Sequence, residues 1–136
     1  MTPFKLQIIT PDGVFFDGMT DNVIVRTTVG DKGILAHHEP YVAAITISKF
    51  KVKIDGEFRF GAISSGIIKV SRDKTVILAQ SCEWADEIDV DRAVRARQTA
   101  EDRISEYSKN NDHKNLDIAE FKLKRALNRI EAAKMK

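Results

Sequence analysis

The sequence holds little that could crosslink the chain or carry it through a membrane. Cys82 is the single cysteine among 136 residues, so no internal disulfide can form, which suits a reducing cytosol. We expect Cys82 to be a small, half-buried packing residue. No apolar run approaches the roughly 20 residues of a transmembrane helix. The opening residues, MTPFKLQ, lack the apolar segment of a secretory signal, so no signal peptide is expected.

Motifs of common catalytic and metal sites are also missing. The sequence has no Gly-x-x-x-x-Gly-Lys-Ser/Thr phosphate loop and no Gly-x-Ser-x-Gly elbow. His37 and His38 are adjacent, so in a strand they would point to opposite faces, and no nearby cysteine or second histidine pair completes a metal set. The acidic residues within 83–89 fit a solvated junction better than a catalytic pair. We therefore expect no enzymatic activity, although a triad assembled only in space would escape this reading.

What is present is the composition of a globular protein, with 43% hydrophobic and 31% charged residues. The net charge of +2 is spread unevenly. Residues 1–87 carry 10 basic and 11 acidic side chains, whereas residues 88–136 carry 12 and 9. The mildly basic C-terminal part is weak evidence for an acidic partner, and it is too little to indicate nucleic acid.

Short alternating apolar segments, separated by turn residues, fill the first 84 residues. Such segments at intervals of roughly 8–12 residues predict an all-β sandwich or barrel. Breaks between strands are expected at the turn Pro11–Gly13, at residues 17–18 and at residues 30–33. The predicted β-sandwich domain spans residues 1–84.

The clearest hairpin signal is the Asp-Gly pair at 55–56, which joins two alternating runs and suits a two-residue turn with positive φ. Lys51 and Lys53 are then expected to face water. Opposite them we expect the charged residues of the second run, Glu57 and Arg59.

From Val90 onward, apolar residues recur every three or four positions, which predicts helices. A polar stretch at 108–115 divides the pattern, so residues 88–136 are predicted to form an antiparallel two-helix hairpin. Asp89 is the expected N-cap of the first helix, and Asn115 or Asp117 that of the second. The fold class is therefore α+β in two parts, with an N-terminal all-β sandwich followed by this hairpin.

Both helical stripes are rich in alanine, which lets helices approach closely but buries little area. Because burial stabilises by roughly 25 cal/mol per Å², an alanine seam contributes less than a leucine seam. The hairpin is expected to depend on docking against the β domain or another protein, and to be the most mobile part of the chain.

Three basic residues of the second helix, Lys122, Arg125 and Arg129, share a face at i, i+3 and i+7. This face is either a solvated surface or a docking surface for carboxylates or phosphates. Folding of the hairpin would bring Arg92 toward Arg125 or Arg129. Like charges placed together repel unless an anion lies between them.

Several segments, in this order and spacing, resemble the epsilon subunit of bacterial F-type ATP synthases over nearly the whole chain. These segments are Thr10-Pro11-Asp12-Gly13, Gly33-Ile34-Leu35, His38-Glu39-Pro40, Ser65-Gly66-Ile67-Ile68-Lys69-Val70, Val76-Ile77-Leu78-Ala79, Ile88-Asp89-x-x-Arg92-Ala93 and Lys124-Arg125-Ala126-x-Asn128-Arg129. One departure is Ala36-His37, where the family usually has Pro-Gly.

The resemblance implies a non-catalytic subunit of the rotor that couples the gamma subunit to the c-ring, with Asp31 and His38 near those contacts. The protein would bind the cytoplasmic side of the bacterial inner membrane peripherally, through the complex alone, and would not bind nucleic acid. The hairpin would act as a brake on ATP hydrolysis. When extended, it would bring Lys122, Arg125 and Arg129 to an acidic stretch of a beta subunit.

In some members of that family, ATP binds the folded hairpin. The resemblance carries this role to a set of positions and implies no required cofactor. The set is Glu83, Ile88, Asp89, Arg92, Ala93, Arg125 and Arg129. Thr99 stands where tight-binding members have an arginine, and one lost charge-assisted contact costs roughly 1.5–3 kcal/mol, or about ten- to a hundredfold. We therefore expect ATP to be a weak regulatory ligand.

The alternative function is a small module that binds acidic ligands or nucleic acid through the basic hairpin. It predicts an affinity for the ligand that falls steeply with salt concentration.

Overall fold

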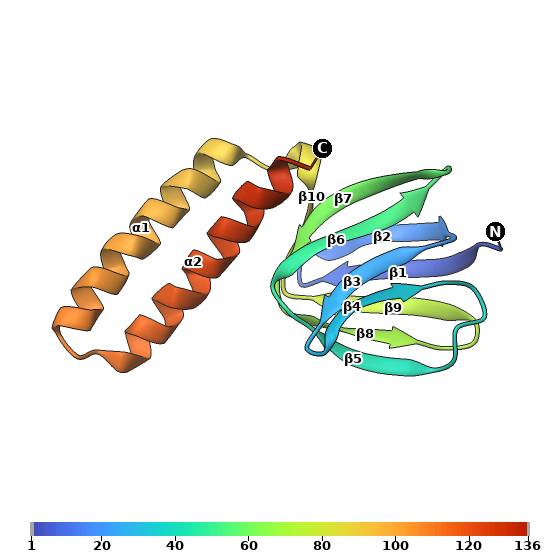
Figure 1. The fold of residues 1–136 in the computed structure, drawn as a ribbon, viewed down its shortest axis with the longest axis horizontal. Helices are drawn as coiled ribbons and strands as arrows, with labels where there is room; N and C mark the ends of the chain where they lie inside the picture. Colours follow the sequence, from blue (N-terminus) through green and yellow to red (C-terminus); the bar gives the residue numbers. More distant parts are fainter. Residues whose placement is uncertain (1, 136) are drawn as a thin grey trace.

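The computed structural model describes residues 2–135, which form a β-sandwich followed by two antiparallel helices (Figure 1). The predicted fold class is confirmed. The elements are β1 (Phe4–Thr10), β2 (Gly13–Thr20), β3 (Val23–Thr27), β4 (Gly30–Ile34), β5 (Tyr41–Ile45), β6 (Ser48–Ile54), β7 (Glu57–Ile63), β8 (Gly66–Val70), β9 (Lys74–Ala79), β10 (Cys82–Trp84), the 3₁₀ turn η1 (Ala85–Glu87), α1 (Val90–Lys109) and α2 (His113–Ala133).

The strands join in the order β10-β7-β6-β3-β5-β8-β9-β1-β2, and β4 pairs with β3. The pair β1–β9 is parallel, whereas neighbours such as β6–β7 and β8–β9 are antiparallel. Neither helix within residues 2–135 has the apolar length that crossing a membrane requires.

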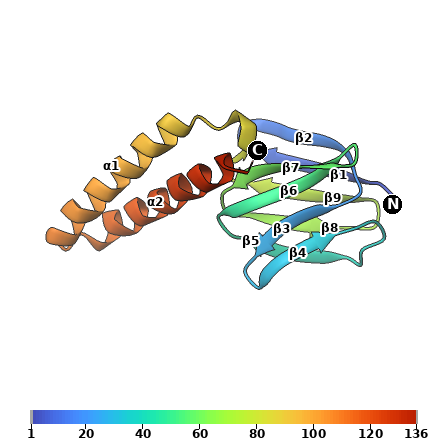
Figure 2. The ribbon, with the colours of Figure 1, turned by 45° about the horizontal axis from the view of Figure 1, so that its top comes forward.

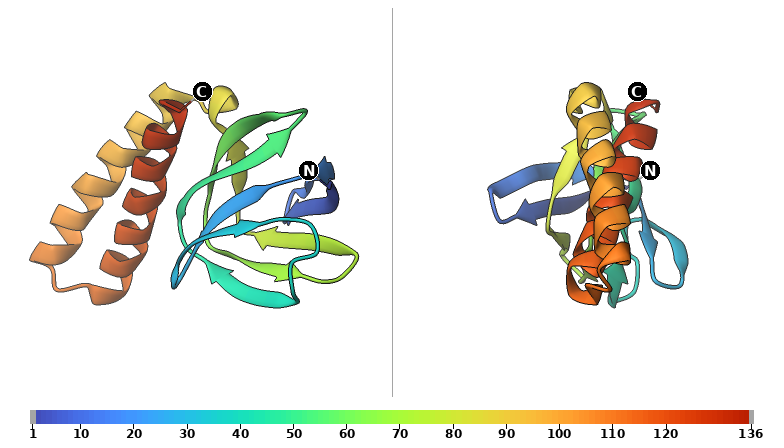
Figure 3. Two further views of the ribbon diagram at one scale, coloured as in Figure 1. Left: turned by 45° about the vertical axis from the view of Figure 1, so that its right-hand side comes forward. Right: turned by 90° about the vertical axis from the view of Figure 1, so that its left-hand side faces the viewer.

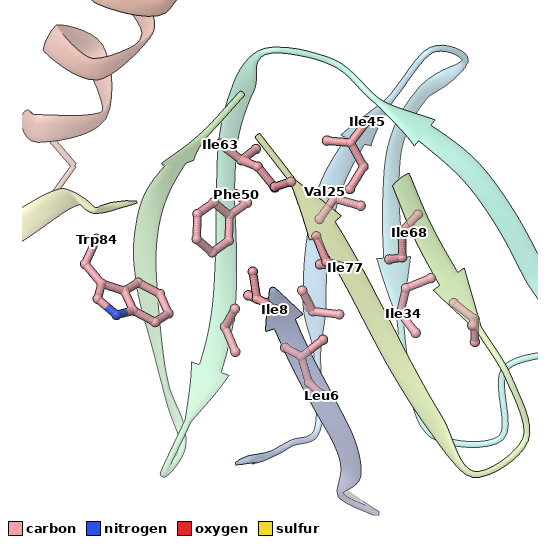
Figure 4. Close-up of a cluster of buried hydrophobic side chains, with 14 residues drawn as sticks. Leu6, Ile8, Val25, Ile34, Ile45, Phe50, Ile63, Ile68, Ile77 and Trp84 are labelled. Carbon is pink, nitrogen blue, oxygen red and sulfur yellow. The ribbon is translucent and has the colours of Figure 1, made fainter. Parts of the chain in front are cut away.

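The core lies between the inner faces of the sandwich, where alternate residues of each strand point (Figure 4). Leu6 and Ile8 of β1 are fully buried, which explains the alternation seen in the sequence. Phe50 and Trp84 pack at the end beside the helices, with ring centroids 5.6 Å apart. β10 therefore closes one end of the core just before the chain enters the hairpin.

Two of the expected strand breaks were wrong. β2 continues through residues 17–18, because it pairs with β1 from Gly13 to Thr20. Residues 30–33 belong to β4, and the turn lies before them, at residues 28–29. There the Thr27 hydroxyl donates to the Gly30 carbonyl at 2.8 Å. In both places the hydrogen bonds to a neighbouring strand outweigh the turn preference of glycine and aspartate.

The Asp-Gly turn is confirmed, with φ of 52° at Asp55 and 85° at Gly56. The expected partners of the lysines were wrong, because a two-residue turn pairs residue 54 with 57. Lys53 is therefore opposite Phe58, and Lys51 is opposite Phe60. The Lys51 ammonium lies 4.7 Å from the centroid of the Phe58 ring, so these lysines cover half-buried aromatic rings.

Asp89 caps α1 as expected, since its carboxylate accepts the backbone N–H of Arg92 at 3.0 Å. Asn115 and Asp117 were the wrong caps for α2. Asp112 caps it by accepting from the backbone N–H of Asn115 at 3.3 Å. The turn spans only residues 110–112, because the polar residues on either side are tolerated in the end turns of helices.

The hairpin joins the sandwich through the C-terminal part of α2, which contacts β6, β7 and η1. Its turn end projects away from the sandwich (Figure 2). The helices lie at one end of the sandwich and leave strands β5, β8, β9, β1 and β2 uncovered by any described helix (Figure 3).

Candidate functional site

A groove of about 540 Å³ runs between α1 and α2. On α1 it is lined by Arg92, Ala96, Thr99, Ala100, Arg103 and Tyr107. On α2 it is lined by Asn115, Ile118, Ala119, Lys122, Arg125, Ala126 and Arg129. Its floor is the alanine seam, in which Ala100, Ala119 and Ala126 are buried. Because these side chains are short, they let the helices touch and leave an open channel above them.

The groove is strongly basic. It is lined by Arg92, Arg103, Lys122, Arg125 and Arg129, whereas no carboxylate of residues 2–135 lines it. Arg92 lines the same groove as Arg125 and Arg129, as the sequence predicted, because the antiparallel hairpin places the start of α1 beside the end of α2. Five cations along one channel repel one another, so a ligand with several negative charges would be stabilised there.

Glu83 lies beside this groove and neutralises one of its cations. Its carboxylate accepts two hydrogen bonds from the Arg129 guanidinium, at 2.6 and 3.1 Å. The pair is partly buried, with 20% of the arginine side chain and 36% of the glutamate side chain exposed. Nearby, Arg125 donates to the Ser81 hydroxyl at 3.4 Å. Charged and polar groups thus tie α2 to strand β10 and to Ser81, the residue before it.

Four of the seven positions predicted for the nucleotide site do not line the groove: Glu83 beside it, and three residues of the junction. Asp89 uses its carboxylate as the helix cap, and Ala93 is fully buried. Ile88 packs in a small apolar cluster with Ala62 of β7 and two alanines at the end of α2, Ala132 and Ala133. These residues set where the hairpin starts and where it rests.

Polar contacts supply most of the remaining attachment. The Asn128 side chain donates to the Ser48 carbonyl at 2.8 Å and to the Ile63 carbonyl at 3.4 Å. The Lys49 ammonium lies 2.8 Å from the Glu131 carboxylate. The hydrogen bond and charge of Lys49 hold the pKa of Glu131 below its ordinary value.

The turn η1 is fixed from the sandwich side. The Arg59 guanidinium lies 4.4 Å from the centroid of the Trp84 ring. The same guanidinium donates to the Asp86 carboxylate at 3.0 Å. Stacking and ion pairing together hold the last residues before the hairpin against the sheet.

Arg103 and Tyr107 are among the lining residues that the sequence analysis did not assign to a site. They follow Arg92 and Thr99 on one face of α1 at helical spacing, so the same count that grouped the basic residues of α2 would have found them. The Arg103 guanidinium donates to the Tyr107 hydroxyl at 3.3 Å.

Asp31 and His38 were expected near contacts with the gamma subunit or the c-ring. They lie away from the groove, in β4 and in the segment after it. Asp31 accepts from the Arg26 guanidinium at 2.9 Å, and this bond raises the pKa of Arg26. His37, at the departure from the family pattern, has φ of 62°. It takes a left-handed conformation that glycine adopts at lower cost.

No group of three or more potential ligands that could hold a metal ion occurs in the described part of the chain. Cys82 is half-buried, and burial raises the pKa of its thiol far above the usual range. It is therefore a packing residue with little thiolate.

An apolar row crosses the uncovered face of the sandwich. It consists of the cross-strand neighbours Ala44, Ile67, Leu78, Ile9 and Val14. Ile67, Leu78 and Val14 are 50%, 51% and 63% exposed. Adjacent exposed apolar residues of this kind mark surfaces that contact another protein.

Two family models match consecutive parts of the chain. The model of the beta-sandwich domain of ATP synthase delta/epsilon chains matches residues 3–85, and that of their long alpha-helix domain matches residues 86–134. An ATP synthase epsilon chain of Ruminococcus albus is 46% identical over 137 residues, covering 100% of both chains. Those of Alkaliphilus metalliredigens and Bacillus velezensis are each 41% identical over 133 residues, covering 98% of this chain and 97% and 98% of their own.

Solved structures resemble the fold at lower identity. A chain in the cryo-EM structure of the Euglena gracilis mitochondrial ATP synthase has a TM-score of 0.79 at 19% identity, covering 100% of this chain and 83% of its own. A chain in the central stalk and c-ring structure of the Tetrahymena thermophila mitochondrial ATP synthase has a TM-score of 0.54 at 14% identity, covering 65% of this chain and 71% of its own.

Proposed function

The chain belongs to the epsilon subunits of bacterial F-type ATP synthases, and on this premise we propose that it is a non-catalytic regulator in the central stalk. In this proposal the sandwich, residues 1–84, joins the gamma subunit to the c-ring. The hairpin, residues 88–136, restrains ATP hydrolysis. The protein would sit at the cytoplasmic side of the bacterial inner membrane through the complex.

The observation that carries the regulatory role is the small attachment of the hairpin. The buried apolar cluster at the junction consists of Ile88 and three alanines, which bury little area. The rest of the attachment is polar and partly exposed, and exposed ion pairs contribute about 0–1 kcal/mol each. A contact of this kind can be exchanged for a contact of similar strength elsewhere.

The released hairpin would present the groove cations to a beta subunit. Lys122, Arg125 and Arg129 lie along one face of α2, and Arg129 would exchange Glu83 for a carboxylate of the partner. An acidic stretch of a beta subunit supplies the matching charge. One arginine–carboxylate pair would thus replace another. This exchange supports a brake in which the docked and the released hairpin differ little in free energy.

The apolar row, Ala44 to Val14, is the surface that we assign to the gamma subunit. It lies on strands that the helices leave open, and exposed apolar faces of this kind are typical of contacts with another protein. Asp31 and His38 would lie at the c-ring or gamma contact.

Replacing Ile67 by Asp is expected to weaken co-purification of this chain with the gamma subunit at least tenfold. The carboxylate would be buried unpaired in the contact, which costs more than about 1.4 kcal/mol. Because Ile67 is 50% exposed, the isolated chain should still fold. The matched control is Ile118→Asp, since Ile118 is 47% exposed but lies on the hairpin. Undiminished recovery with Ile67→Asp would show that gamma binds elsewhere.

ATP is the regulatory ligand that we propose for the groove. Its phosphates match the row of guanidinium and ammonium groups, and the groove volume of about 540 Å³ falls in the range of small-molecule sites. Thr99 contributes no charge, so the affinity should be weak.

Titration of the chain with ATP is expected to slow backbone hydrogen exchange in the hairpin, at concentrations of several millimolar. The bound triphosphate would bridge α1 and α2 and hold both helices together. Arg125→Gln should reduce this protection, whereas Arg72→Gln, in the sandwich, should leave it unchanged. If exchange within residues 88–133 stays the same in saturating ATP, the groove does not serve as an ATP sensor.

A further inference from the structure

We propose that Asn128 is a clamp that keeps the hairpin docked on the sandwich independently of salt, and that losing its two hydrogen bonds frees the hairpin to inhibit. Asn128 is a positioning residue in this proposal, because it acts only through the place where α2 rests. The consequence for ATP hydrolysis rests on the proposed function of the hairpin, whereas the clamp itself can be tested on this chain alone.

The end of α2 docks on one row of side chains that crosses three strands. Lys49 of β6, Ala62 of β7 and Glu83 of β10 are cross-strand neighbours. Lys49 pairs with Glu131, and Glu83 pairs with Arg129. Between them, Ala62 belongs to one apolar cluster with two alanines at the end of α2. This row therefore holds α2 through two ion pairs and a small apolar contact.

Asn128 contacts the next row of the same sheet, and there it binds backbone instead of side chains. Ser48 and Ile63 lie opposite each other in the pair of β6 and β7. The Asn128 side-chain amide, which has two N–H donors, donates to both carbonyls, at 2.8 and 3.4 Å. Because both acceptors belong to one row, a shift of α2 by one helical turn, about 5.4 Å, would separate the amide from them. Asn128 thus fixes the height at which α2 docks.

The clamp differs from the ion pairs in its response to salt. The Lys49 and Glu131 side chains are 31% and 62% exposed, so salt screens their attraction. Salt also reaches the pair of Glu83 and Arg129, since 36% of the glutamate side chain is exposed. The Asn128 amide and the carbonyls that it binds carry no net charge. Its hydrogen bonds should therefore persist at ionic strengths that weaken both ion pairs.

Loss of the two donors should favour the undocked hairpin. Asn128 is half-buried, so a leucine of similar shape in its place would cover the two carbonyls without binding them. An unsatisfied polar group that is kept from water costs more than its hydrogen bond contributes. Undocking returns the carbonyls to water. We expect Asn128→Leu to raise the ratio of undocked to docked hairpin at least about tenfold.

The first test follows the tumbling of the hairpin in the full chain by NMR relaxation of the backbone amide nitrogens. It compares low salt with about 1 M NaCl, where the Debye length is only about 3 Å. In the unmodified chain, the helices and the sandwich should share one rotational correlation time at both salt concentrations. In Asn128→Leu, the helices should tumble faster than the sandwich, most clearly at high salt.

The matched control is Asn110→Leu, because Asn110 follows α1 at the turn end of the hairpin, away from the sandwich. It should behave as the unmodified chain does. The chemical shifts of β1 and β8, which no described helix covers, report whether the sandwich stays folded. If the leucine disturbs them, Asn128→Ala removes the same donors with a smaller side chain.

The second test measures steady-state ATP hydrolysis by the assembled ATP synthase, purified through another subunit. Asn128→Leu should lower hydrolysis several-fold, and Asn110→Leu should leave it unchanged. If the helices and sandwich of Asn128→Leu kept one correlation time at high salt, Asn128 would not be the clamp. If the unmodified chain undocked at high salt as fully as the variant, docking would be ionic and the inference wrong. Faster tumbling of the variant hairpin with unchanged hydrolysis would support the clamp and overturn the brake instead.

Discussion

Deletion of residues 88–136 is expected to raise ATP hydrolysis by the assembled ATP synthase several-fold without loss of assembly. The deletion removes the basic helix that we propose binds a beta subunit, whereas the apolar row and the core of the sandwich remain. The measurement is steady-state ATP hydrolysis by complexes purified through another subunit, together with the amount of truncated chain that they contain.

A substitution with the opposite effect provides the control for this deletion. Lys49→Glu places a negative charge beside Glu131, which Lys49 contacts at 2.8 Å, and so weakens docking of the hairpin. No hairpin residue is changed, so the undocked hairpin should inhibit more often and hydrolysis should fall. If neither the deletion nor Lys49→Glu changed the rate of ATP hydrolysis, the brake would be ruled out, but the role in the stalk would not.

Replacement of Phe50 by Ala is expected to lower the free energy of unfolding of the chain by about 3–5 kcal/mol. Phe50 is 2% exposed and packs against Phe15 and Trp84. Its ring also covers Gly61, where an added Cβ would lie 2.4 Å from a ring carbon. A glycine and a large ring thus fill one space together, and neighbouring side chains cannot refill it after truncation.

Urea unfolding followed by the fluorescence of Trp84, the single tryptophan, measures this loss. Phe58→Ala is the matched control, because Phe58 lies on the outer face of the same hairpin, half-buried beneath Lys51. Phe58→Ala should lower the free energy of unfolding clearly less than Phe50→Ala does. Similar losses for the two variants would mean that Phe50 does not anchor the core.

The sequence predicted what depends on short-range patterns. Alternation marked Leu6 and Ile8 as buried, the Asp-Gly pair located a hairpin, and Asp89 was identified as a cap. The pairing of Lys51 with Phe60 was missed, although the two-residue turn dictates it. Strand ends at glycines were misplaced because pairing with a neighbour, which sequence does not display, decided them.

The helical pattern of the sequence predicted the basic face of α2 and, through the predicted hairpin, the approach of Arg92 to that face, but it did not predict how the hairpin docks on the sandwich. Lys122 and Arg125 share a helical face, so spacing alone grouped them. The bond between Glu83 and Arg129 joins residues 46 positions apart and depends on where the hairpin rests, which no local pattern reveals. Burial of Ala93 at the seam likewise required the packed pair of helices.

The fixed turn η1 determines how the hairpin can swing. Arg59 fastens Trp84 and Asp86 to the sheet, so the chain stays anchored until Ile88, and the next residue, Asp89, already caps α1. The pivot is therefore a pair of extended residues, and α1 acts as a stiff lever. With 20 residues at about 1.5 Å each, it is roughly 30 Å long. A modest rotation at the pivot would therefore move the turn end of the hairpin along a wide arc of nearly constant radius. The position of the sandwich on the rotor would then decide which neighbouring subunits the hairpin can reach.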